Sequence, residues 1–255
     1  MPDSASQPPP LLALSGVGKV FRNGTTALDA LDLPVAPGAF LSILGPSGCG
    51  KSTLLRIIAG LTPATMGQVI WDERGRAGGI GFVFQEPTLM PWATVWDNVY
   101  LPLRLQGQGR AAVAPRIAAT LAAVGLEGFP QTYPRELSGG MRMRVSIARA
   151  LVTEPRLLLL DEPFAALDEL TRFKLNEDLL RLWQRAGCTI IFVTHSVFES
   201  VFLSNRVVVM TPRPGRVIDD IAIDLPYPRD GELRMQAQYV ERCREVSHRL
   251  AATAR

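Results

Sequence analysis

The chain has 255 residues, 47% of them hydrophobic, so it can bury the core of one domain built from two or three lobes. Its net charge of +3 is compatible with an anionic membrane surface but too diffuse to indicate a nucleic-acid partner. The apolar runs near residues 157 and 207 are far shorter than the ~20 residues of a transmembrane helix, so no membrane span is expected. Three cysteines, far apart and odd in number, indicate reduced thiols.

The first part of the chain predicts a tail followed by strands. Residues 1–10 lack a basic start and an apolar centre, so we expect a flexible tail and not a signal peptide. Residues 11–33 and 69–84 are expected to contribute β-rich pieces around a parallel core. The mostly apolar run 39–44 suits a buried parallel strand, and residues 52–61 carry apolar side chains at helical spacing.

Between that strand and that helix, residues 45–52 fit the P-loop pattern G-x-x-x-x-G-K-[ST] at every fixed position. Its glycines let backbone N–H groups converge on the α- and β-phosphates of a nucleotide. Lys51 reaches the β- and γ-phosphates, the Ser52 hydroxyl can ligate Mg²⁺, and Thr53 extends the same helix start. The predicted ATP-binding residues here are Gly45, Pro46, Ser47, Gly48, Cys49, Gly50, Lys51, Ser52 and Thr53.

Cys49 is a separate question within this loop. A thiol at a helix start can have a lowered pKa and react with alkylating agents, so we hypothesise that modification of Cys49 blocks ATP hydrolysis. The alternative is a small residue tolerated at a free position of the motif.

The next predicted strand, 80–84, leads into a helical region. Gln85 follows this strand, and a helical segment is expected from Thr94 to about Gly125, with Thr94 and Asp97 spaced as a helix cap. Taken alone, Gln85 is equally consistent with a solvated loop residue.

Residues 137–141, Leu-Ser-Gly-Gly-Met, predict a second helix start shaped for phosphate. Ser138 is a favoured N-cap, Gly139 and Gly140 let backbone N–H groups approach an anion, and the helix dipole adds attraction. A capped surface helix with a glycine turn is the alternative. Since a complete P-loop already lies upstream, this LSGGM segment indicates a protein that works in pairs.

Two further strands end in chemically active side chains. The apolar run 157–160 leads into Asp161 and Glu162, where Asp161 would hold Mg²⁺ and Glu162 would polarise the water that attacks the γ-phosphate. An acidic turn after a buried strand is the alternative. His195 follows the strand expected at 189–194, and the carboxyl end of a core strand is where open α/β sheets bind ligands.

The remaining elements follow the same reasoning. Ser196 and Glu199 have the spacing of a capping box. Residues 212–215, Pro-Arg-Pro-Gly, predict a turn before a strand at 217–225, and residues 232–250 predict an amphipathic helix packed on the core.

The order and spacing of these motifs, with Ala166-Leu167-Asp168, resemble those of ABC transporter ATPase subunits from about residue 11 to residue 217. The resemblance implies an α/β fold: a P-loop NTPase with a RecA-like parallel-sheet core, an antiparallel β lobe and an inserted α-helical subdomain at about 86–150. The implied organisation is an ATPase domain at 11–230 followed by a C-terminal helix at 231–255.

The family resemblance also implies roles for these residues. ATP would be sandwiched between the P-loop of one copy and the LSGGM segment of the other in a homodimer, with Asp168 at the dimer seam. Phe21 would stack on adenine where the family often has tyrosine, the alternative being a buried strand phenylalanine. Met143 stands where glutamine is frequent. The implied catalytic residues are Gln85, Glu162 and His195, the implied metal ligands are Ser52, Gln85 and Asp161, and the implied nucleotide contacts in trans are Ser138, Gly139 and Gly140.

The stretch 84–92 and Met141 resemble the nitrate, sulfonate and taurine importer group within that family. This implies a peripheral position on the cytoplasmic side of the inner membrane, integral membrane permease subunits as partners, a periplasmic or extracellular solute-binding protein as an indirect partner, and no nucleic acid. The cargo would be nitrate, a sulfonate, taurine or a similar small solute.

Other classes stay open on the sequence. One is a soluble ABC ATPase that acts on DNA or ribosomes, although the segment between Ser52 and Leu137 lacks the sustained heptads of a coiled coil. Another is a P-loop kinase, which needs no LSGGM segment. Export in place of import is the third.

Overall fold

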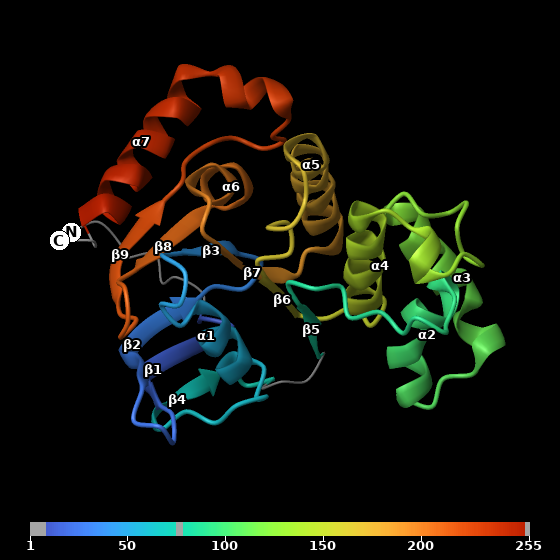
Figure 1. Cartoon of the computed structure of the whole chain (residues 1–255), viewed down its shortest axis with the longest axis horizontal. Helices are drawn as coiled ribbons and strands as arrows, with labels where there is room; N and C mark the ends of the chain where they lie inside the picture. Colours follow the sequence, from blue (N-terminus) through green and yellow to red (C-terminus); the bar gives the residue numbers. More distant parts are fainter. Residues whose placement is uncertain (1–8, 75–78, 253–255) are drawn as a thin grey trace.

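Two β-sheets organise the computed structural model, which describes residues 9–74 and 79–252. The larger sheet has six strands in the order β5-β6-β7-β3-β8-β9 (Figure 1). Its strands pair in parallel except β9, which is antiparallel to β8. The strands are β3 (Phe40–Leu44), β5 (Ile80–Val83), β6 (Leu157–Asp161), β7 (Thr189–Thr194), β8 (Arg206–Met210) and β9 (Val217–Ala222).

The central strands are mostly apolar because both faces of this sheet are covered. Every residue of β3, β6 and β7 is buried, as in parallel sheets flanked by helices. Alternate residues serve different cores: Leu157 and Leu159 pack with α1 (Lys51–Ile58) and the smaller sheet, whereas Leu158 and Leu160 join the core that holds α5 (Glu169–Ala186) and α6 (Val197–Leu203).

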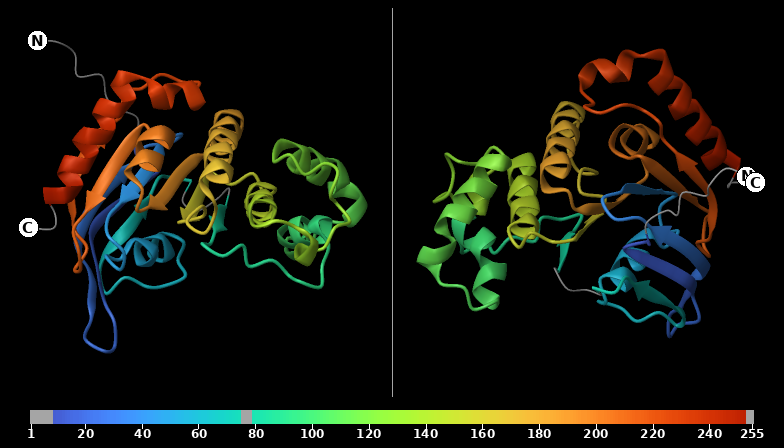
Figure 2. Two further views of the ribbon diagram at one scale, coloured as in Figure 1. Left: turned by 45° about the horizontal axis from the view of Figure 1, so that its top comes forward. Right: turned by 180° about the vertical axis from the view of Figure 1, so that it is seen from behind.

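The smaller sheet is antiparallel and has the order β2-β1-β4. Its strands are β1 (Leu12–Val20), β2 (Thr26–Val35) and β4 (Met66–Trp71). The β1–β2 turn extends beside the start of α1, so a strand pair from the beginning of the chain forms one wall of the site described below (Figure 2).

A group of helices projects sideways from the sheets in every view (Figures 1 and 2). Thr94 caps the first helix by accepting a hydrogen bond from Asp97 N at 3.1 Å. The helical segment expected from Thr94 to about Gly125 is divided into two helices, and the chain turns between them at Gly107, which has φ 78°. The group consists of α2 (Val95–Leu105), α3 (Arg110–Ala123), the 3₁₀ helix η1 (Pro134–Glu136) and α4 (Gly139–Leu151).

The C-terminal segment packs across α6. Arg229 is buried and donates hydrogen bonds of 2.9 Å to the carbonyl oxygens of Val201, Phe202 and Ser204, so it satisfies the end of that helix. The helix predicted at 232–250 is divided into a 3₁₀ helix, η2 (Gly231–Met235), and α7 (Ala237–Ala252).

Other predicted boundaries differ slightly from the structure. The helix predicted to reach residue 61 ends at Ile58 because Gly60, with φ 76°, leaves the helical conformation. The strand predicted at 217–225 ends at Ala222. The predicted tail lies outside the described residues except for Pro9 and Pro10, as do residues 253–255 of the predicted C-terminal helix. Within the described ranges, no helix is long and apolar enough to cross a membrane.

Candidate functional site

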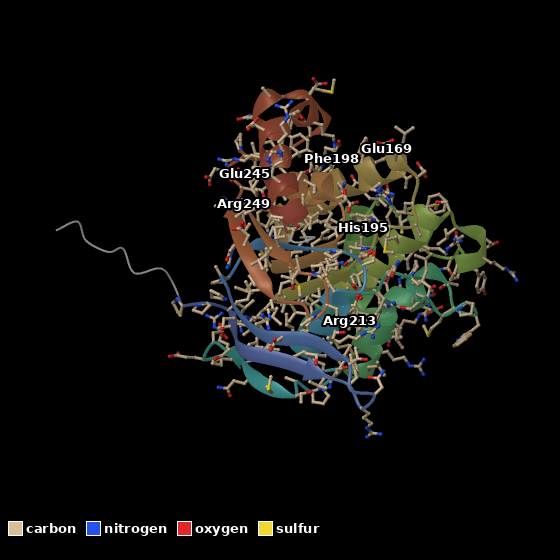
Figure 3. All side chains as sticks on the ribbon, turned by 60° about the vertical axis from the view of Figure 1, so that its left-hand side comes forward. Glu169, His195, Phe198, Arg213, Glu245 and Arg249 are labelled. Atoms are coloured by element: carbon tan, nitrogen blue, oxygen red, sulfur yellow. The ribbon has the colours of Figure 1, made fainter. Side chains whose placement is uncertain are left out.

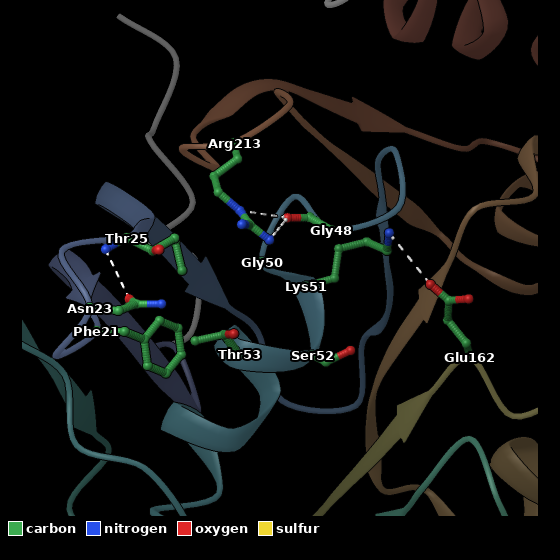
Figure 4. A pocket seen from close by; sticks show the side chains of 11 residues that line it. Phe21, Asn23, Thr25, Gly48, Gly50, Lys51, Ser52, Thr53, Glu162 and Arg213 are labelled. Atoms are coloured by element: carbon green, nitrogen blue, oxygen red, sulfur yellow. Dashed lines mark hydrogen bonds and ion pairs between the residues drawn. The ribbon is translucent and has the colours of Figure 1, made fainter.

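A cavity of about 300 Å³ lies beside the P-loop, at the edge of the large sheet where its parallel strands end. The β1–β2 turn, the start of α1, the end of β6 and the β8–β9 turn enclose it (Figure 4). Its lining residues are Phe21, Asn23, Thr25, Ala27, Gly48, Gly50, Lys51, Ser52, Thr53, Glu162 and Arg213.

The P-loop conformation depends on its glycines. Gly48 and Gly50 have φ 76° and 105°, which L side chains rarely adopt. A Cβ atom on Gly50 would also lie 2.8 Å from Ala27 O, so only glycine fits against β2. Gly50 is the N-cap of α1 and no side chain caps this helix, so its first N–H groups remain available to an anion.

Lys51 is the buried cation of the site. Its side chain extends back along the loop, where Nζ donates to Gly45 O at 2.8 Å and to Pro46 O at 3.0 Å. Nζ also lies 3.5 Å from Glu162 Oε1. These partners satisfy an ammonium group on a residue that is only 4% exposed.

Asp161, at the end of β6, is joined to the start of α1. The Ser52 hydroxyl donates a hydrogen bond of 2.7 Å to Asp161 Oδ1. Burial raises the pKa of the Asp161 carboxyl, and the bond from Ser52 partly opposes that rise. A hydroxyl and a carboxylate are oxygen donors of the kind that Mg²⁺ prefers. Among the described residues, no cluster of three or more His, Cys, Asp or Glu side chains is placed to hold a metal.

Glu162 connects two strands through its backbone and its side chain. Its φ of 45° is unusual for a residue with a Cβ atom, and its N–H donates to Val193 O at 3.0 Å. Its carboxylate lies between Lys51 and His195, whose Nδ1 is 3.0 Å from Glu162 Oε2. A strained backbone that aims a carboxylate at two polar groups is typical of a functional site.

His195 lies at the junction of β7 and α6, on the face turned toward the viewer in Figure 3. The Ser196 hydroxyl accepts from Glu199 N at 3.3 Å, but the reciprocal half of the predicted capping box is wrong. The Thr194 hydroxyl instead accepts from Ser196 N at 3.0 Å and donates to Glu199 Oε2 at 2.6 Å. The Glu199 side chain is buried, so its carboxyl needs a partner inside the protein, and the Thr194 hydroxyl provides one. Burial also raises the pKa of the Glu199 carboxyl.

The LSGGM segment and Asp168 lie away from this cavity. Ser138 is exposed and caps α4 by accepting from Met141 N at 3.2 Å. Asp168 is exposed and caps α5 by accepting from Thr171 N at 2.9 Å. The two helix starts meet closely, since a Cβ atom on Gly140 would lie 2.8 Å from Thr171 Cγ2. Ser138, Gly139, Gly140 and Asp168 are therefore brought near one another but do not line the cavity.

Gln85 is also exposed and does not line the cavity. The segment after it is fixed by α4: Arg149 donates to Pro87 O at 3.0 Å and to Thr88 O at 2.9 Å. Burial lowers the pKa of the Arg149 guanidinium. Gln85 thus begins a connection that is tied to the helix following the LSGGM segment.

The structure agrees with the predicted position of Phe21 but not with the predicted pKa of Cys49. Phe21 is 41% exposed and lines the cavity, so it is not a buried strand residue. The predicted lowering of the Cys49 pKa is wrong: the thiol is fully buried, and burial raises its pKa more than nearby Lys51 lowers it. The structure therefore supports the alternative of a small residue that fits the loop.

Some lining residues were not predicted. Asn23 and Thr25 come from the β1–β2 turn, where Asn23 Oδ1 accepts from Thr25 N at 3.1 Å. Arg213, from the predicted turn 212–215, donates to Gly48 O from Nε at 3.1 Å and from Nη2 at 3.0 Å. Nothing in the sequence indicates that this turn lies beside the P-loop, because the two are far apart in the chain.

The chain is similar to known proteins along most of its length. Residues 28–165 match the family model described as "ABC transporter". The chain is 49% identical, over 86% of its length, to an uncharacterized ABC transporter ATP-binding protein of Methanocaldococcus jannaschii, 84% of which is covered. It is 45% identical, over 86% of its length, to an aliphatic sulfonates import ATP-binding protein of Bacillus cereus, 88% of which is covered.

Solved structures show the same likeness. The cbiO1 subunit of the ABC transporter complex cbiONQ from Clostridium perfringens superposes with a TM-score of 0.78 at 27% identity, covering 96% of this chain and 97% of that one. A dimeric ATP-binding cassette bound to ADP and Pi superposes with a TM-score of 0.74 at 33% identity, covering 84% of this chain and 100% of that one. The predicted α/β P-loop NTPase fold is confirmed.

Proposed function

The chain belongs to the ABC transporter family, and from this premise we propose that it is the ATP-binding subunit of an importer, hydrolysing ATP between two copies arranged head to tail. Membership in this family identifies an ATPase and excludes the P-loop kinase alternative. The observation that best supports the proposed chemistry is the chain of contacts from Lys51 through Glu162, which lines the cavity, to His195.

These residues suit the cleavage of a phosphoanhydride bond. The uncapped N–H groups of α1 and the Lys51 ammonium would bind the β- and γ-phosphates and stabilise the negative charge that develops there. The Glu162 carboxylate would accept a hydrogen bond from the attacking water, and His195 would orient that carboxylate. Phe21 would supply an aromatic face for adenine at the far end of the cavity.

Mg²⁺ is the metal that this site fits. Ser52 and Asp161 would hold it, with Gln85 as a further ligand if the segment after β5 moves inward. The ion would neutralise charge on the phosphates when bound. Its presence would also favour the ionised form of Asp161, which burial disfavours in the chain alone.

A second copy would complete the site. The exposed Ser138 and the glycines beside it would approach the γ-phosphate bound by the partner, and Asp168 would lie at the seam. The solved cassette dimer with ADP and Pi supports such pairing. Loss of the bridging γ-phosphate after hydrolysis would then release the two copies from each other.

The proposed transport role requires membrane partners, which would contact the surface outside the nucleotide site. We propose that the chain binds permease subunits on the cytoplasmic side of the membrane and that Gln85 and the projecting helices transmit its movement to them. The similarity to two aliphatic sulfonates import proteins, at 45% and 47% identity, favours a sulfonate or a similar small anion as cargo, delivered by a solute-binding protein.

This transport role is tested by identifying permease and solute-binding-protein genes near the gene for this chain and coexpressing their products with it. Uptake of taurine or an alkanesulfonate, with ATPase activity that rises when the loaded binding protein is added, is the expected result. ATPase activity indifferent to these partners would favour an ABC ATPase not tied to transport, and efflux would favour an exporter.

The catalytic assignment is tested by Glu162→Gln. This variant keeps the shape of the side chain but removes its charge, so hydrolysis should fall by at least about 100-fold. ATP that is bound but not cleaved should trap a dimer, visible by light scattering in MgATP. Glu127→Gln, an exposed position in the helical group, is the matched control. Rapid turnover by Glu162→Gln, or a monomer in MgATP, would overturn the assignment.

A further inference from the structure

The turn between β8 and β9, residues 211–216, is fixed against the P-loop and the start of β2. Gly215 N donates to Ala27 O at 2.9 Å, and Gly215 O accepts from Asp29 N at 3.0 Å. A Cβ atom on Gly215 would lie only 2.1 Å from Cys49 O, so the turn touches the P-loop backbone directly. Backbone contacts on both sides therefore hold the turn, and the ion pair between Arg216 and Asp29 adds to them.

This turn presents Arg213 to the nucleotide cavity. The guanidinium donates two hydrogen bonds to Gly48 O, from Nε at 3.1 Å and from Nη2 at 3.0 Å (Figure 4). Its remaining nitrogen, Nη1, makes no hydrogen bond to a described residue. Arg213 is exposed and projects on the same face of the molecule as His195 (Figure 3).

The charges around the cavity make Arg213 distinctive. The charged residues that line it are Lys51, Glu162 and Arg213. Lys51 is buried and lies 3.5 Å from Glu162, so its charge is already partly balanced. No carboxylate of a described residue lies within salt-bridge distance of Arg213. Arg213 is thus the uncompensated cation at this mouth, and a guanidinium is well suited to phosphate oxygens.

We propose that Arg213 is a nucleotide-binding residue that holds the P-loop through Gly48 and directs its free nitrogen to the polyphosphate of the bound nucleotide. This inference rests on the proposed ATPase function and adds a contact from a turn that carries none of the recognised motifs. Two hydrogen bonds to a single carbonyl oxygen fix the guanidinium plane, so little side-chain freedom is lost when the phosphate is bound.

The test is equilibrium binding of MgADP and of inorganic pyrophosphate, measured by calorimetry on the full chain. Arg213→Gln should weaken both by about tenfold, because a charge-assisted hydrogen bond is lost in each case. Arg213→Lys keeps the charge but loses the planar guanidinium, so its loss of affinity should be smaller than that of Arg213→Gln. Arg216→Gln is the matched control: Arg216 is in the same turn but pairs with Asp29 outside the cavity, and its variant should bind within about twofold of the wild type.

Each outcome decides the inference. Wild-type affinity in Arg213→Gln would overturn it, and so would weakened MgADP binding with unchanged pyrophosphate binding, which would place the contact on the nucleoside. Equal losses in Arg213→Gln and Arg213→Lys would also overturn it, because the residue would then act only through the shape of the turn. If the wild-type chain bound no MgADP, the proposed ATPase function itself would fail, whereas normal wild-type binding with no effect of Arg213→Gln would remove only the role of Arg213.

Discussion

The starts of α1 and α4 share one feature of their composition but have very different surroundings. Both are rich in glycine and both point backbone N–H groups outward, which suits an anion. The start of α1 is enclosed by two turns and the end of β6, and Lys51 reaches back along its loop. The start of α4 is open, and its Ser138 caps the helix from an exposed position. We propose that the start of α1 binds phosphate within a single chain, whereas the start of α4 does so only against a second copy.

The open helix start is nevertheless held in place. Gly140 and Thr171 approach too closely for any larger side chain at residue 140, so α4 and α5 begin side by side. Arg149, farther along α4, fixes the backbone at Pro87 and Thr88, just after Gln85. The α4 start is therefore placed relative to both the core and the Gln85 segment. Changes at these two helix starts should therefore have separable effects on nucleotide binding and on hydrolysis.

The largest effect is expected at the enclosed site. Lys51→Met removes the buried cation and leaves Glu162 without its partner at 3.5 Å, so ATP hydrolysis should fall by about 100- to 1,000-fold. MgADP binding should weaken at the same time, because the lost charge belongs to the site within one chain. Phosphate release and calorimetry measure the two effects. Lys174→Met, an exposed position on α5, is the control, and near-normal turnover by Lys51→Met would contradict the enclosed-site assignment.

The second effect should separate binding from turnover. Ser138→Arg places a bulky side chain at the open helix start, which would prevent this helix start from contacting the γ-phosphate bound by the partner. Hydrolysis should therefore fall by about 100-fold. MgADP binding to the monomer should stay within about twofold of the wild type, since Ser138 does not line the cavity. Arg135→Ala, also exposed and nearby, is the control. An equal loss of MgADP affinity in Ser138→Arg would show that the two helix starts serve one site in the same chain.

The same contrast explains what the sequence predicts well. The central strands are mostly apolar runs whose carboxyl ends share one edge of a parallel sheet, so Asp161 and His195 are predicted from this pattern, and Ser52 is predicted from the P-loop motif. Arg213 is not, because its place depends on a turn packed against a distant loop. The raised pKa of Cys49 is also not predicted from the sequence. A helix start lowers a thiol pKa, but complete burial reverses that shift, and burial depends on packing.

A smaller effect should appear in stability at Asp161, part of the enclosed site. Burial raises its pKa above the ordinary value of 3.8, so the folded chain binds a proton more tightly than the unfolded chain. The free energy of unfolding therefore falls as the pH rises from about 4 through the raised pKa of Asp161. Asp161→Asn should melt a few degrees higher than the wild type at pH 7, where about 2–4 °C corresponds to 1 kcal/mol.

That difference should shrink as the pH is lowered toward 4, because the wild-type carboxyl is then protonated as well. Thermal melts without nucleotide, at pH 7 and pH 4.5, measure it. Asp224→Asn, which is exposed, should show no such gain at either pH. If the wild type melted higher than Asp161→Asn at pH 7, the buried carboxylate would stabilise the empty site. The enclosure of this site would then carry no electrostatic cost.

The smallest effect is expected at Cys49, where the enclosure of the P-loop works against reactivity. The thiol is fully buried and burial raises its pKa, so iodoacetamide should label it in the folded chain at least about tenfold more slowly than in urea at pH 8. Cys188 and Cys243 are also buried with raised pKa values, so labelled sites must be distinguished by mass spectrometry of peptides. Cys49→Ala should hydrolyse ATP within about twofold of the wild type, because the loop needs only a small side chain there. Rapid labelling of Cys49 that is prevented by MgATP would mean that the P-loop opens in the absence of nucleotide. The start of α1 would then be as open as the start of α4 until ATP binds.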